Sequence, residues 1–153
     1  MSKNSRNTVV IGLVAGGLIV AILGGWLVTR PGTDAVASAE VIAQGRQVYA
    51  DQCASCHGAD LAGQPDWRSP LPSGRLPAPP HDASGHTWHH PDAVLFRIVK
   101  EGTAAIVGGG YESDMPGFGG VLSDAEIRAV LAYIKSTWPE RERGYQVRVS
   151  EAD

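Results

Sequence analysis

The feature that most constrains this chain is its cysteine pair, which stands in the stretch Gln-Cys-Ala-Ser-Cys-His-Gly at residues 52–58. Cys53 and Cys56 are the only two cysteines of the chain, and His57 follows the second one directly. Three chemistries use a pair with this spacing: a redox dithiol, half of a zinc site, or a covalently attached haem. Each needs different partners elsewhere in the chain, so the rest of the sequence distinguishes them.

Two of the three chemistries fit the remaining sequence poorly. A thioredoxin-type dithiol lies in an alternating pattern of strands and helices, and no convincing strand precedes Cys53. A structural zinc site needs four ligands, commonly two pairs, and the chain has no second cysteine pair. The third chemistry uses the whole motif, because C-x-x-C-H is the attachment signal for c-type haem. We therefore predict one covalent haem c, attached to Cys53 and Cys56, with His57 as an axial ligand of the iron.

Met115 is the predicted second axial ligand. The chain has two methionines, and the other is Met1. Met115 lies in a glycine-rich stretch and is followed by Pro116. A thioether is a soft, neutral ligand that favours ferrous iron and raises the reduction potential. The alternative is an ordinary core methionine. The rival ligands are His81, His86, His89 and His90.

Residues 8–28 form a run of 21 residues without a charged side chain. A helix of this length spans the hydrocarbon core of a bilayer. Lys3 and Arg6 precede the run, so the N-terminus is expected in the cytoplasm and the rest of the chain outside it. The alternative is a signal peptide cleaved near residues 35–37, but a signal core is shorter, typically about 7–15 residues. We expect a retained, single-pass transmembrane helix.

The chain divides into four expected segments. They are a cytoplasmic tip and transmembrane anchor at 1–30, a linker at 31–38, a haem domain at 39–138 and a charged tail at 139–153. Eight linker residues reach at most about 28 Å, which keeps the haem domain close to the lipid bilayer. Gly12 and Gly16 have the spacing that pairs membrane helices, which is compatible with weak dimerisation, although glycine is common in membrane spans.

Helical periodicity predicts three main helices in the haem domain. The first covers about residues 39–52. The second begins near Pro91 and stops at Gly102. The third opens with a capping box formed by Ser123 and Glu126.

The segments between and after these helices have a different character. Residues 58–90 are rich in Gly, Pro, Asp and Ser and are predicted to form a long loop. In the tail, Tyr145, Val147 and Val149 alternate with other residues. This alternation is compatible with an added strand, and a frayed end is the alternative.

Charge narrows the range of partners. Residues 31–153 hold all 16 acidic residues but 10 of the 13 basic ones, which gives this part a formal charge of −6. Binding to nucleic acid is not expected from this balance, because it requires basic residues that neutralise phosphates. Only Lys100 and Lys135 are lysines of this part. We expect docking through a basic patch on the partner or through an apolar rim.

Three stretches of the sequence resemble a known family. They are "GRQVYADQCASCHGADLAGQ" at 45–64, "MPGFGG" at 115–120 and "LSDAEIRAVLAYIKSTW" at 122–138. Over about residues 39–138 the chain resembles the class I monohaem cytochromes c, and most closely the bacterial membrane-anchored members. The resemblance implies an all-α fold of three main helices around one covalent haem, with a place in the bacterial inner membrane and the haem domain on the periplasmic side.

The resemblance also implies specific contacts. The first and last helices would cross where Gly45 and Tyr49 meet Leu131 and Tyr133. A proline carbonyl would accept the Nδ1 proton of His57, and Pro79 is the expected residue, with Pro77 and Pro80 close behind.

Two further side chains are candidates for the haem surroundings. Arg75 and Trp88 could each donate a hydrogen bond to a haem propionate. The alternatives are a solvated loop charge for Arg75 and simple packing for Trp88.

The predicted function is electron transfer in a respiratory or related redox chain, not catalysis. If His57 and Met115 both bind the iron, no coordination site remains for a substrate. The short linker makes membrane redox complexes the expected partners: a quinol-oxidising complex, a terminal oxidase or a dehydrogenase. One alternative is copper or other metal handling by the histidine-rich stretch at 81–90. The other is haem-based sensing or peroxidase chemistry, if Met115 leaves the iron.

Overall fold

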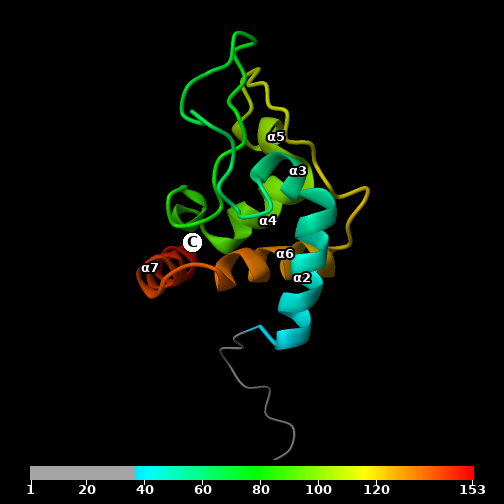
Figure 1. Ribbon diagram of the computed structural model, residues 1–153, viewed down its shortest axis with the longest axis vertical. Coiled ribbons are helices and arrows are strands. Elements are labelled where there is room, and N and C mark those ends of the chain that lie inside the picture. Colours follow the sequence, from blue (N-terminus) through cyan, green and yellow to red (C-terminus); the bar gives the residue numbers. More distant parts are fainter. Residues whose placement is uncertain (1–36) are drawn as a thin grey trace, which may run out of the picture. The chain divides into compact units, whose positions relative to one another are not determined.

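The computed structural model describes residues 37–153, which form helices joined by loops, with no strand among them (Figure 1). This confirms the predicted all-α class for the described part of the chain. Its helices are α2 (Ala39–Gln52), α3 (Ala54–His57), the 3-10 turn η1 (Thr87–His89), α4 (Asp92–Glu101), α5 (Thr103–Val107), α6 (Asp124–Ser136) and α7 (Glu140–Glu151). The uncharged run at 8–28, with the predicted anchor and dimerisation motif, lies outside the described residues. No helix within 37–153 combines the length and apolarity needed to cross a membrane.

The crossing of α2 and α6 is the main helix–helix contact of the fold (Figure 1). It depends on Gly45, where a Cβ atom would lie 1.9 Å from the carbonyl oxygen of Ala129 and 3.0 Å from the Cβ of Tyr133. Only glycine permits so close an approach of the two backbones. One turn further along α2, the rings of Tyr49 and Tyr133 lie 5.5 Å apart. The atoms nearest to Gly45 thus belong to Ala129 and Tyr133, whereas Leu131 is buried in the same core.

The core of the domain is built mainly from α6 and the residues that pack on it. The capping box predicted at the start of α6 is present, with Ser123 and Glu126 each bonding to the backbone of the other. The apolar stripe of α6 is buried, and its members are Ile127, Val130, Leu131 and Ile134. Trp138, just after the helix, is 1% exposed and donates from Nε1 to the carbonyl oxygen of His81 at 2.6 Å. This bond fixes the long loop against the end of α6.

The segment that contains Met115 runs along the C-terminal end of α4. This helix ends at Gly102, whose φ of +88° is a conformation that favours glycine. A Cβ at Gly117 would lie 2.7 Å from the carbonyl oxygen of Glu101, so both glycines are needed for this close packing. Backbone hydrogen bonds from Phe118 to Val99 and from Gly119 to Lys100 hold the segment in place. Met115 is therefore positioned by α4 although it lies in a loop.

The tail folds as helix α7, so the strand considered from its alternating residues is wrong. Pro139 precedes the helix, which runs from Glu140 to Glu151. The residues buried on its inner face are Glu142 and Gln146, four positions apart, each 3% exposed. Because this face is polar, helical periodicity of apolar residues could not reveal it.

Candidate haem site

The cysteine–histidine motif begins at Cys53, the residue between α2 and α3, and continues through the short helix α3. Cys53 is partly buried, Cys56 is exposed, and no disulfide joins them. Burial raises the pKa of Cys53 to about 11. A redox dithiol depends on a cysteine with a lowered pKa, and burial shifts the pKa of Cys53 in the opposite direction. Two thiols at this spacing fit attachment to the two vinyl groups of a haem.

The position of the motif is fixed from both sides. The hydroxyl of Tyr49 donates to the carbonyl oxygen of Gly58 at 2.8 Å, which ties the end of α3 back to α2. Gly58 has a φ of +80° and ends the helix directly after His57. The carbonyl oxygen of His57 also accepts a hydrogen bond from the amide of Gly63 at 2.8 Å. The backbone that carries His57 is thus held by contacts to two neighbouring segments.

The ring of His57 is buried and oriented. Its Nδ1 lies 2.8 Å from the carbonyl oxygen of Pro79, the residue expected from the resemblance. A carbonyl can only accept, so Nδ1 carries the proton and the lone pair is on Nε2. Burial lowers the pKa of His57, which favours the neutral imidazole that binds a metal. The ring is therefore prepared to ligate iron through Nε2.

Met115 lies in the loop between α5 and α6, and both its sulfur and its backbone amide make polar contacts. The hydroxyl of Thr103, at the start of α5, lies 3.3 Å from the sulfur. The amide of Met115 donates to the Ser113 hydroxyl at 3.1 Å. Thr103 was missed by sequence reasoning, because nothing in its sequence context links it to a residue twelve positions later.

Arg75 is engaged by carboxylates of its own chain. Its guanidinium pairs with Glu112 at 3.4 Å and with Asp114 at 2.5 Å. The carboxylate of Asp114, then that of Glu112, raises the pKa of Arg75. These pairs connect the long loop to the residue that precedes Met115. A contact between Arg75 and a haem propionate stays a prediction.

The hydrogen bonding of Trp88 indicates whether the residues present fit a haem. Its Nε1 is the buried side-chain polar atom of the described residues that has no hydrogen-bond partner. Buried donors are nearly always satisfied, so this one points to an acceptor supplied by a bound group. A haem carries two carboxylates, which are suitable acceptors. The unpaired indole nitrogen and the free Nε2 of His57 together fit a haem.

The histidine-rich stretch does not form a metal cluster. His81 stacks on His57 with ring centroids 4.0 Å apart, and its Nδ1 contacts the Thr87 hydroxyl at 2.8 Å. Burial lowers the pKa of His81 to about 3. If His57 holds the iron, a ring stacked on His57 would lie on the same side of the iron, so His81 would not serve as the opposite ligand. His86 stacks on Trp67, and His89 stacks on Trp88. Within residues 37–153, no three His, Cys, Asp or Glu side chains are grouped as a metal site would require.

Comparison with known proteins identifies the domain. The family described as "Cytochrome c" matches residues 42–138. This chain belongs to the cytochrome c family. Its members carry a covalently bound haem c, and Cys53, Cys56 and His57 stand in the attachment positions. The predicted cofactor is thereby confirmed.

The relatives of this cytochrome c domain are longer redox proteins. The chain is 38% identical over 96 residues to "Thiosulfate dehydrogenase" of Stutzerimonas stutzeri (strain A1501), which covers 62% of this chain and 27% of that protein. It is 47% identical over 38 residues to "Cbb3-type cytochrome c oxidase subunit FixP" of Sinorhizobium medicae (strain WSM419). This alignment covers 25% of this chain and 13% of that protein. The matches thus span about a quarter or less of these relatives. No solved structure matches the chain. The family and these relatives support electron transfer by a c-type cytochrome.

Proposed function

We propose that this chain is a membrane-anchored electron carrier whose haem iron is bound by His57 and Met115. The observation that carries the proposal is the orientation of the His57 ring. Its Nδ1 proton is bound by the Pro79 carbonyl at 2.8 Å, so its Nε2 is left for the iron. This carbonyl also raises the basicity of the imidazole, which stabilises its bond to iron.

The surroundings of Met115 support its role as the second ligand. A thioether sulfur has two lone pairs, and the Thr103 hydroxyl at 3.3 Å uses one of them. The other lone pair is then available to a metal. The packing of Gly117 against Glu101 restrains the loop, so the sulfur does not depend on a mobile segment for its position.

The bound haem supplies an iron that alternates between the ferrous and ferric states. With a haem bound, His57 and Met115 would hold the iron and would leave no position for another ligand. The haem would then supply electron transfer without a bond between substrate and iron. The side chain of Cys56 is exposed, so the thioether that it forms lies at the protein surface. We propose that redox partners approach on this side.

We propose a location on the periplasmic side of a bacterial inner membrane, and the uncharged run at 8–28 with the basic residues before it supports this proposal. With a linker of at most about 28 Å, the domain meets membrane neighbours at high effective concentration. We propose a quinol-oxidising complex, a terminal oxidase or a dehydrogenase as its partner. The names of the relatives, an oxidase subunit and a dehydrogenase, support this class.

Fractionation of cells that express the full chain tests the anchor. We expect the haem in the membrane fraction, resistant to high salt and released by detergent. A matched variant with residues 1–30 replaced by a cleavable export signal should appear in the soluble periplasmic fraction. Recovery of the unaltered chain as a soluble, shortened protein would contradict the anchor and favour the cleaved signal.

Carbon monoxide tests the closed coordination that distinguishes a carrier from a sensor or peroxidase. The ferrous wild type should show no change in its Soret band under carbon monoxide, because Met115 occupies the sixth position. The variant Met115→Ala, purified in the same way, should bind the gas and serves as the positive control. Binding by the wild type would overturn the proposal.

A further inference from the structure

Helix α7 lies beyond residue 138, where the match to the cytochrome c family ends. It packs against η1, which contains Trp88, and against the residues that follow η1. If this charged helix only extended the chain, it would not need a fixed position on the domain. In this protein, however, it is attached to the segment 87–92 by two independent sets of contacts.

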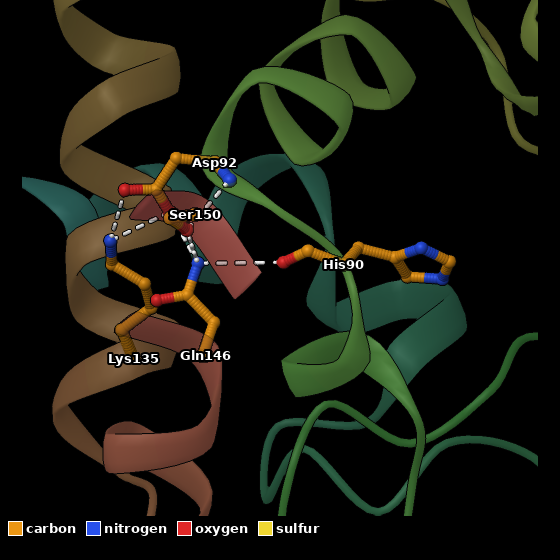
Figure 2. Close-up of polar contacts among 5 residues, drawn as sticks. All are labelled: His90, Asp92, Lys135, Gln146 and Ser150. Carbon is orange, nitrogen blue, oxygen red and sulfur yellow. Dashed lines mark hydrogen bonds and ion pairs between the residues drawn. The ribbon is translucent and has the colours of Figure 1, made fainter. Parts of the chain in front are cut away.

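The first set is a polar network centred on Gln146 (Figure 2). The buried amide of Gln146 donates to Asp92 at 2.6 Å and to Ser150 at 2.9 Å, with a longer contact of 3.4 Å to the carbonyl oxygen of His90. The amide of Asp92 donates to the Ser150 hydroxyl at 3.1 Å. The Asp92 carboxylate also pairs with Lys135 of α6 at 2.8 Å, and the oxygen Oδ1 accepts from both Lys135 and Gln146. The start of α4 is thus held by α6 and α7 together.

The second set is aromatic. Tyr145 of α7 meets the ring of Trp88 edge-on, with centroids 5.4 Å apart and the planes at 89°. The ring of His89 stacks on the ring of Trp88, with centroids 3.7 Å apart. It also meets the ring of Tyr145 edge-on, with centroids 5.2 Å apart. Edge-to-face and stacked geometries are the favoured ones for aromatic pairs. The indole is therefore held in one orientation, with its buried Nε1 unpaired.

We propose that α7 is a positioning element for the haem: Tyr145 and Gln146 hold Trp88 so that its Nε1–H donates to a haem carboxylate. The inference rests on the proposed electron transfer by a bound haem, but it does not require Met115 to be the sixth ligand. The positive end of the N–H dipole near the haem disfavours the ferric form. Fixing this dipole therefore raises the reduction potential and seals that edge of the site.

The indole proton of Trp88 gives a direct readout in the full-length, haem-loaded protein. In the ferrous state, ¹⁵N NMR should show this N–H protected from exchange with solvent. The variant Trp88→Phe keeps an aromatic ring but removes the donor, and identifies the signal. Its reduction potential should be lower than that of the wild type. An indole N–H that exchanges freely in the wild type would overturn the assignment of the donor.

Variants of α7 test the positioning role. Tyr145→Leu and Gln146→Leu should each shift the potential in the same direction as Trp88→Phe and speed up exchange of the Trp88 N–H. Tyr145→Phe keeps the ring that contacts Trp88 and His89 and should match the wild type. Val147→Ala, at a position 51% exposed on the same helix, is the second control.

The outcomes separate this inference from the proposed function. If Trp88→Phe lowers the potential while Tyr145→Leu and Gln146→Leu leave it unchanged, α7 has no positioning role. If an α7 variant does not fold, the exchange rate in the wild type and the potential of Trp88→Phe still decide the donor. Binding of carbon monoxide by the wild type would contradict the closed carrier and leave this inference standing.

Discussion

The Nδ1 of His57 lies 2.8 Å from the carbonyl oxygen of Pro79, and this contact depends on the close packing of Gly63 against the Pro79–Pro80 peptide. A Cβ at Gly63 would lie 2.7 Å from the carbonyl carbon of Pro79 and 2.5 Å from the nitrogen of Pro80. Gly63 therefore allows the loop to approach closely enough for its carbonyl to reach the ring. The orientation of His57, the proposed axial ligand, depends on this contact.

Gly63→Ala should weaken the bond between His57 and Pro79. We expect a loss of about 1–3 kcal/mol in the free energy of unfolding from overpacking, in addition to the cost of a positive φ. The reduction potential should rise, because an imidazole without this acceptor is a weaker donor to ferric iron. Gly74→Ala is the matched control, since Gly74 has a φ of +84° but nothing within 4 Å of a Cβ. Equal unfolding free energies and equal potentials for the two variants would refute the account.

Gly45→Ala tests the crossing of α2 and α6. The added Cβ would lie 1.9 Å from the carbonyl oxygen of Ala129, so the two helices must move apart. Overpacking of this kind costs about 1–3 kcal/mol of unfolding free energy, measured by chemical denaturation. Gly144→Ala serves as the control in α7, where the nearest atom lies at 3.6 Å. Alanine inside a helix should stabilise by about 0.5–1 kcal/mol, and loss of stability in both variants alike would argue against the crossing.

Thr103→Val tests the hydroxyl that contacts the sulfur of Met115 at 3.3 Å. This hydrogen bond withdraws electron density from the sulfur, which favours ferrous iron. Its removal should lower the reduction potential with little change in the volume of the side chain. Thr103→Ser keeps the hydroxyl and should stay close to the wild type in a spectroelectrochemical titration. A serine variant that shifts as far as the valine variant would assign the effect to packing instead.

Arg75→Gln tests the connection between the long loop and the loop of Met115. Without the pairs to Glu112 and Asp114, added imidazole should displace the methionine from ferric haem more readily. The pairs are exposed, so we expect a modest effect that disappears at high salt. Arg68→Gln is the control, because Arg68 lies over the ring of Trp67 at 4.1 Å and forms no ion pair within residues 37–153. Equal imidazole affinities of Arg75→Gln and wild type at low salt would refute the connection.

The parts of the site that could be predicted from sequence are those encoded by neighbouring residues. Cys53, Cys56 and His57 form one local motif, and the capping box of Ser123 and Glu126 spans a single turn. Helices α2, α4 and α6 follow from periodicity within short windows. Pro79 came from family resemblance, since no local rule connects it to a ring 22 positions earlier.

The parts that could not be predicted depend on contacts between distant residues or on a polar interior. Thr103, at the start of α5, contacts the sulfur of Met115 in the following loop, and Arg75 pairs with carboxylates 37 and 39 positions away. The buried side of α7 presents Glu142 and Gln146, so the apolar pattern indicated a strand or a frayed end where a helix forms. Hydrogen bonds of Gln146 attach that helix to residues 90 and 92, and hydrophobic periodicity does not detect such bonds.

The central claim is a haem iron bound by His57 and Met115, and the absorption spectrum of the ferric full-length protein tests it most directly. A methionine sulfur on ferric haem gives a weak charge-transfer band at the red end of the visible spectrum. We expect this band in the wild type and in His89→Ala, and its loss in Met115→Ala. A wild-type spectrum without the band, or a Met115→Ala spectrum that keeps it, would contradict the assignment.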